Sequence, residues 1–200
     1  MKPGRREVLI LGAAGLAAAA AGFLAGPLAL RSTGRNGAGE AAGTADMDIA
    51  LRSAAFPDLA GQTRTLGEWR GRVLVCNFWA TWCAPCREEI PMFMAVRAKY
   101  AASGVEFVGI AVDNPSNVRQ FAASFKISYP VLLAEADGLD LMRKLGNIAG
   151  GLPYTVVADR QGAIAHRKLG ALKRDDLEGI LAPMTRNAAG AKGEGEGNFV

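Results

Sequence analysis

Residues 72–91, with the sequence RVLVCNFWATWCAPCREEIP, are the most informative stretch of this 200-residue chain. The run Arg72 to Trp79 is almost continuously apolar and rich in β-branched residues, as a central strand covered on both faces requires. From Cys86 to Ser103 the residues favour a helix, with apolar side chains at helical spacing and Gly104 at its end. The Cys83–Cys86 pair therefore falls where a buried strand passes into a helix.

The segment Cys83-Ala84-Pro85-Cys86 has the spacing of a redox-active dithiol. Unpaired N–H groups and the dipole at a helix N-terminus stabilise a thiolate, so Cys83 should ionise more readily than an ordinary cysteine. Cys86, one turn into the helix, is close enough to bond Cys83 and should be shielded. We therefore expect Cys83 to attack a substrate disulfide and Cys86 to resolve the mixed disulfide. Pro85 limits how far the two sulfur atoms can separate.

Other roles for the cysteines fit the spacing less well. A purely structural disulfide across four residues would stabilise the fold little, because it closes a very short loop. A zinc site would need a second Cys or His pair, and His166, expected on the surface, is the one histidine of the chain. Cys76 lies inside the apolar strand, where a free thiol behaves as a small hydrophobe. We expect no metal and no cofactor.

The rest of the chain alternates strand and helix patterns. Phe56 to Leu66 predicts a short β-hairpin around a glycine turn. The later expected elements are the strand Val105 to Val112, the helix Pro115 to about Phe125, the strand Pro130 to Leu133, the helix Asp137 to Leu145, the strands Tyr154 to Ala158 and Ala163 to Leu169, and a helix from Asp175 or Asp176 to about Leu181. This order predicts an α/β fold with a mixed central β-sheet sandwiched by helices.

The two ends of the chain differ in composition from its middle. Val8 to Leu30 has no charged residue and is long enough to cross a ~30 Å hydrocarbon core as a helix. Arg5 and Arg6 precede it, which predicts an exported remainder and partly matches a twin-arginine signal. No aromatic residues interleave with the basic ones, so nucleic-acid binding is not expected. The expected organisation is a signal or anchor at 1–30, a flexible linker at 31–47, a folded domain at 48–184 and a disordered tail at 185–200.

Residues 77–91 resemble the active-site segment of the TlpA/ResA-like thioredoxins, which are membrane-tethered or periplasmic disulfide reductases. The resemblance extends from about Phe56 to Pro183 and implies a thioredoxin-like fold with an N-terminal β-hairpin. It also implies that the segment from Val112 to Val131 is the helix–strand insertion that separates this family from plain thioredoxin. Residues 151–155, Gly-Leu-Pro-Tyr-Thr, are similar to the family's cis-proline loop.

The resemblance also implies roles for single residues. Asn77 occupies the position of a buried aspartate in thioredoxin, and Glu89 is expected to take over that residue's proton-transfer role. Glu89 lies three residues after Cys86, on the same helix face, where burial could raise its pKa; compensation of the helix dipole is the alternative role. Client contacts are expected from Trp82, Ala84, Pro85, Leu152 and Pro153.

The implied function is reduction of disulfides in exported proteins, on the extracytoplasmic (periplasmic) side of the bacterial inner membrane. The implied clients include apocytochrome c and copper-site assembly proteins, the implied electron donor is a membrane thiol transporter, and the protein is expected to be a monomer. Two alternatives stay open. One is a disulfide oxidase or isomerase, because the dipeptide between the cysteines does not fix the direction. The other is a copper(I) metallochaperone, since soft thiolates suit that ion.

Overall fold

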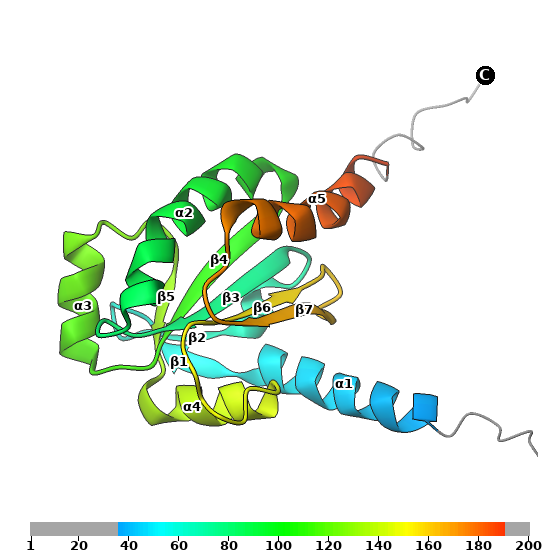
Figure 1. The fold of residues 1–200 in the computed structure, drawn as a ribbon, viewed down its shortest axis with the longest axis horizontal. Coiled ribbons are helices and arrows are strands. Elements are labelled where there is room, and N and C mark those ends of the chain that lie inside the picture. Colours follow the sequence, from blue (N-terminus) through cyan, green and yellow to red (C-terminus); the bar gives the residue numbers. More distant parts are fainter. Residues whose placement is uncertain (1–35, 191–200) are drawn as a thin grey trace, which may run out of the picture. The chain divides into compact units, whose positions relative to one another are not determined.

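The structure is a computed structural model that describes residues 36–190, and Val8 to Leu30 lies outside them (Figure 1). Among the described residues no helix has the length and apolar character needed to span a membrane. The elements in chain order are α1 (Asn36–Ser53), β1 (Ala55–Pro57), β2 (Thr63–Thr65), the 3-10 helix η1 (Leu66–Trp69), β3 (Val73–Trp79), α2 (Ala84–Tyr100), the 3-10 helix η2 (Ala101–Ser103), β4 (Val105–Ala111), α3 (Pro115–Ser124), β5 (Val131–Leu133), α4 (Glu135–Lys144), β6 (Tyr154–Ala158), β7 (Ile164–Leu169) and α5 (Arg174–Gly190).

The main sheet contains five strands in the order β5-β4-β3-β6-β7. β3, β4 and β5 run parallel, while β6 and β7 are antiparallel to their neighbours. β1 and β2 form the expected N-terminal hairpin as a separate two-stranded sheet. The predicted α/β class with a mixed central sheet is therefore confirmed, and α3 with β5 forms the predicted helix–strand insertion.

Strand β3 lies at the centre of the sheet, and all seven of its residues are buried. Its side chains alternate between two hydrophobic cores, one on each face of the sheet. Val75 and Trp79 belong to the core that α2, α3 and α5 cover, together with Cys83 and Cys86. Cys76 and Phe78 belong to the opposite core, which α4 and the C-terminal end of α1 cover. In Figure 1, α2 and α5 accordingly lie on the other side of the sheet from α4.

Two expectations about the chain ends were wrong. Residues 36–47 of the expected linker belong to α1, whose residue Leu51 is 1% exposed in the second core. Residues 185–190 of the expected tail continue α5, which runs through Pro183. Leu181 is fully buried and Met184 packs against the same core, so tertiary packing outweighs the proline's helix-breaking tendency. Residues 31–35 and 191–200 lie outside the described part.

Candidate active site

The dithiol lies between the end of β3 and the start of α2, as the sequence predicted. Cys83 is the N-cap residue of α2 and Pro85 follows in the first helical turn. The two cysteines form a disulfide, and the Sγ of Cys83 accepts a hydrogen bond from the backbone N–H of Cys86 at 3.4 Å. Cys83 is 6% exposed and Cys86 is fully buried, so of the two residues only Cys83 keeps any surface in contact with solvent. This asymmetry fits an attacking and a resolving cysteine.

Asp113 holds the turn that leads into the dithiol. It follows β4, and its Oδ2 accepts hydrogen bonds from the backbone N–H of Thr81, at 2.9 Å, and from the Thr81 hydroxyl. Burial alone would raise the pKa of Asp113, but the hydrogen bonds from Thr81 and Asn114 outweigh it and lower the pKa. The carboxylate therefore stays ionised and ties the end of one parallel strand to the end of its neighbour.

Glu89 is buried beneath the dithiol on α2, with 4% of its surface exposed. Its Oε1 accepts a hydrogen bond from Asn77 Nδ2 at 2.9 Å, and its Oε2 accepts one from the backbone N–H of Leu172 at 3.1 Å. Burial raises the pKa of Glu89 to about 7, and the two hydrogen bonds only partly offset this. The raised pKa expected from the sequence is thus confirmed in direction. A carboxyl group with this pKa is suited to accept and return a proton near neutral pH.

Asn77, Thr155 and Tyr129 complete the buried polar group around Glu89. Asn77 and Thr155 are paired in the register of β3 and β6, and Asn77 Nδ2 also donates to Thr155 Oγ1 at 3.0 Å. Tyr129 is buried in the same core, where burial and then the negative charge of Glu89 raise its pKa. Sequence reasoning assigned no function to Thr155, Tyr129 or Asp113, because register and packing alone bring them to the site. The sequence feature that could have pointed to this buried group is Asn77, a polar residue within an otherwise apolar strand.

The loop before β6 reaches the same end of the sheet. Phe78 pairs with Tyr154, so the preceding Leu152–Pro153 bond lies beside the C-terminal end of β3, and this bond is cis as predicted. Asn147 brackets the loop, because its side chain donates to Gly151 O and accepts from Gly151 N. Leu152 is half-buried and Pro153 is buried.

The surface around Cys83 is apolar and exposed. Trp82 is 70% exposed, Ala84 and Pro85 are also exposed, and Leu169, paired with Tyr154, is 53% exposed. The predicted client-contact residues therefore lie at one end of the sheet, and all of them except Pro153 are at least partly exposed. Exposed large apolar side chains around a reactive group are typical of a surface that binds other proteins.

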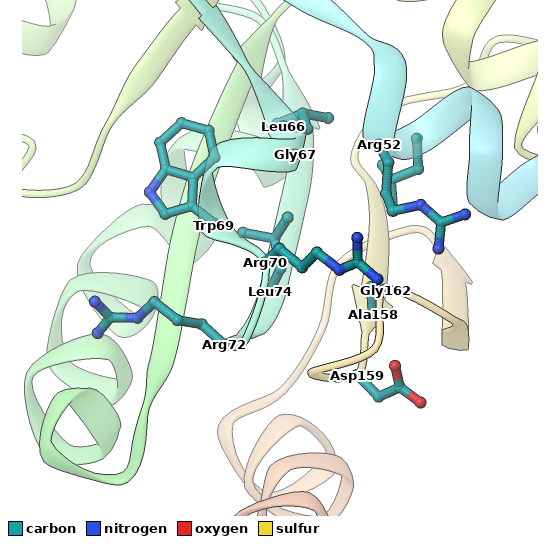
Figure 2. Close-up of a pocket in the computed structure, with 11 residues that line it drawn as sticks. Arg52, Leu66, Gly67, Trp69, Arg70, Arg72, Leu74, Ala158, Asp159 and Gly162 are labelled. Carbon is teal, nitrogen blue, oxygen red and sulfur yellow. The ribbon is translucent and has the colours of Figure 1, made fainter.

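A small hollow lies at the end of the sheet opposite the dithiol and takes no part in the dithiol chemistry (Figure 2). Leu74 and Ala158, which line it, are paired at the start of β3 and the end of β6. Its cavity volume is only about 20 Å³. Neither it nor any cluster of three His, Cys, Asp or Glu side chains within residues 36–190 offers a metal site.

Comparison with known proteins gives consistent matches. The Redoxin family model matches residues 43–181. The thiol-disulfide oxidoreductase ResA of Geobacillus kaustophilus is 32% identical over 122 residues, which are 60% of this chain and 68% of that protein. A thiol:disulfide interchange protein of Chlorobium tepidum is 30% identical with a TM-score of 0.60, over 68% of this chain and 94% of that one. A secreted thiol-disulfide isomerase from Corynebacterium glutamicum shares the fold, with a TM-score of 0.62, at 24% identity over 68% of this chain and 85% of that one.

Proposed function

This chain belongs to the redoxin family, within which it is a thiol–disulfide oxidoreductase of the TlpA/ResA-like group, and we propose that it works as a reductase of disulfides in exported proteins. The observation that carries the proposal is the pairing of Cys83, the less buried cysteine at the start of α2, with a buried Glu89 whose pKa is about 7. A reductase needs a thiolate that attacks and a group that deprotonates the second thiol.

The reaction proceeds in two exchanges. The thiolate of reduced Cys83 attacks one sulfur of the client disulfide, which forms a mixed disulfide and releases the other client sulfur as a thiolate. Glu89 then takes the proton of the Cys86 thiol, and Cys86 attacks the sulfur of Cys83. The client leaves with both sulfurs reduced, and the protein keeps the Cys83–Cys86 disulfide that the structure contains. Two electrons have passed to the client, and an external dithiol must return them.

The remaining assignments follow the family resemblance. Trp82, Ala84, Pro85 and the loop at Leu152 and Pro153 form the client surface, where an extended client segment could add backbone hydrogen bonds beside Leu152. Apocytochrome c and copper-site assembly proteins are the proposed clients, and a membrane thiol transporter is the proposed donor. Residues 1–30 are proposed to direct the folded domain to the extracytoplasmic side, as anchor or cleaved signal. The extracytoplasmic oxidising environment would then require a dedicated reductant.

The reduction potential of the Cys83–Cys86 couple tests the direction of the reaction. Equilibration of the protein in thiol–disulfide buffers should give a value near or below about −270 mV, the value of thioredoxin. A value near about −120 mV would instead show a disulfide donor and would overturn the reductase proposal. The double variant Cys83→Ser/Cys86→Ser corrects for the remaining thiol at Cys76, which should not take part in the exchange.

A further inference from the structure

A hollow beside the dithiol is not accounted for by the reaction above. It has a cavity volume of about 240 Å³ and is lined by Ala84, Arg87, Glu88 and Phe125. Ala84 directly follows Cys83 in the chain, so the hollow borders the residue next to the cysteine that forms the mixed disulfide. The opposite wall, Phe125, comes from the end of α3 in the helix–strand insertion. The hollow is therefore built partly by the end of α3 as well as by the first turns of α2.

Arg87 is the residue in this hollow whose geometry points to a ligand. Its guanidinium carbon lies 5.7 Å from the ring centre of Phe121 and 5.8 Å from that of Phe125. The two rings stack on each other with centroids 4.0 Å apart and planes inclined by 17°. A guanidinium that packs against aromatic rings keeps its N–H donors available at its planar edge. The aromatic pair therefore packs near the Arg87 guanidinium without using its hydrogen-bonding capacity.

No carboxylate within residues 36–190 forms an ion pair with Arg87, and its side chain donates no hydrogen bond there. Arg97, ten residues and nearly three turns further along α2, behaves differently because it is paired with Glu106. Glu88 lines the same hollow, but consecutive helix residues point about 100° apart and do not face each other. The hollow thus contains a cation that forms no ion pair within residues 36–190, close to the partial positive charge at the start of α2.

We propose that this hollow binds an acidic side chain of the client, an aspartate or glutamate next to the client cysteine that bonds to Cys83. Its carboxylate would accept hydrogen bonds from the free edge of the Arg87 guanidinium, and its methylene groups would pack against Phe125. Glu88, on the rim, opposes the same ligand by charge repulsion. This preference for clients with an acidic residue beside the cysteine rests on the proposed reductase function. It depends on Arg87 and Phe125, and not on the dithiol itself.

The test uses the full-length protein, kept in detergent and reduced beforehand. Its substrates are three disulfide-linked peptides that differ only in a Glu, Gln or Lys beside the cysteine. The measured quantity is the second-order rate constant for peptide reduction at low ionic strength. The wild-type protein should reduce the Glu peptide about tenfold faster than the Lys peptide, with the Gln peptide between them. Because the pair is solvent-accessible, 0.5 M salt should weaken this preference.

Variants separate the contributions of the side chains. In Arg87→Gln the rates for the Glu and Gln peptides should become equal, and Arg87→Lys should recover only part of the preference because it lacks the planar donor edge. Glu88→Gln should increase the preference for the Glu peptide. Arg119→Gln is the matched control, since Arg119 lies on α3, donates to Leu59 O and does not line the hollow, and it should keep the wild-type preference. Thermal unfolding of each variant checks that it is folded.

The outcomes distinguish the two proposals. If all three peptides are reduced at the same rate, or the Lys peptide fastest, the acidic preference is overturned and the reductase function stands. If the wild-type protein reduces none of the peptides, the reductase proposal fails and the preference fails with it. A preference for the Glu peptide that survives in Arg87→Gln would overturn the assignment to this hollow.

Discussion

At the scale of single residues, Glu89 shows how burial and hydrogen bonding set a proton affinity. Burial raises the pKa of Glu89 to about 7, against the 4.5 of an exposed glutamate, although Asn77 and Leu172 both donate to its carboxylate. Ionising this buried carboxyl group therefore lowers the free energy of unfolding of the oxidised protein. The same raised pKa gives the carboxyl group its use, because a glutamate with an ordinary pKa would be too weak a base to deprotonate a thiol.

Replacing Glu89 should therefore change how stability depends on pH. The folded-state pKa is above the unfolded value, so the contribution of Glu89 to native stability is most favourable below about pH 4.5 and is lost as the pH rises through about 7. Glu89→Gln should remove this fall and be more stable than the wild type at pH 8, by up to about 3 kcal/mol. Denaturant unfolding of the oxidised proteins between pH 4 and 8 measures it. Glu88→Gln, at an exposed position, is the control, and parallel pH profiles for wild type and Glu89→Gln would contradict the argument.

The same variant should slow the second exchange of the reaction. Without a carboxylate to take the proton of Cys86, we expect the mixed disulfide with a client peptide to persist about 10- to 100-fold longer at pH 8. Acid quenching followed by mass spectrometry would count the trapped intermediate over time. A lifetime equal to that of the wild type would show that another base serves Cys86.

Single residues also mark how far the sequence could predict the site. Cys83 and Cys86 were predicted from their spacing at the start of a helix, and Glu89 from the resemblance to the TlpA/ResA-like thioredoxins. Thr155 and Asp113 were not found, since each reaches the site only through the pairing of neighbouring strands. The local sequence does not show which strands pair in the sheet, so residues such as Thr155 and Asp113 can be assigned to the site only from the three-dimensional fold.

At the scale of the elements, α3 owes its start to one side chain. Asn114 Oδ1 accepts hydrogen bonds from the backbone N–H of Ser116 at 2.9 Å and from its hydroxyl at 2.7 Å, and Pro115 occupies the first helical turn. This is the usual N-cap arrangement, with a proline at the first helical position. It matters for function because α3 positions Phe121 and Phe125, against which Arg87 packs.

Asn114→Ala should loosen α3 while leaving the main sheet intact. Loss of an N-cap costs about 1 kcal/mol, so amide hydrogen exchange in the first turn of α3 should accelerate about fivefold. Gln120→Ala, at an exposed position of the same helix, should leave the exchange rates unchanged. Faster exchange throughout β3 and β4 as well would show that α3 is not an independent unit.

The helix ends illustrate where element prediction failed. Gly, Ala and Thr dominate the chain before Asp46, and a proline such as Pro183 usually ends a helix, so the local sequence indicated a linker and an early stop. Both helices nevertheless continue, and α5 does so over the buried side chains of Leu177 and Leu181. Propensity is a weak influence compared with the burial of an apolar helix face.

At the scale of the whole molecule, the parallel strands place function and scaffold at different ends of the sheet. The C-terminal ends of β3 and β4 lead into the dithiol and into Asp113, while the hollow of Figure 2 lies at the other end. α1 belongs to the scaffold, because Leu51 is almost fully buried in the core that Phe78 and Leu132 share. The fold class was predictable from the order of strands and helices, whereas this contribution of α1 was not.

Leu51 should be as important to stability as a residue in the sheet. Leu51→Ala leaves a cavity in the second core and should lower the free energy of unfolding by about 2–5 kcal/mol. Ile49→Ala is the matched control, since Ile49 lies on the same helix with 56% of its surface exposed and should change stability by less than about 0.5 kcal/mol. Equal effects of the two substitutions in urea unfolding would contradict the assignment of α1 to the core.

In the oxidised protein, the buried thiol of Cys76 can be used to report unfolding. With Cys83 and Cys86 joined, Cys76 is the one free thiol of the chain; it is fully buried, and burial raises its pKa. Its side chain belongs to the core on the face of the sheet opposite the dithiol. An alkylating reagent should therefore label the oxidised protein only when the central strand becomes exposed. The labelling rate then measures how often the middle of the molecule opens, without any engineered probe.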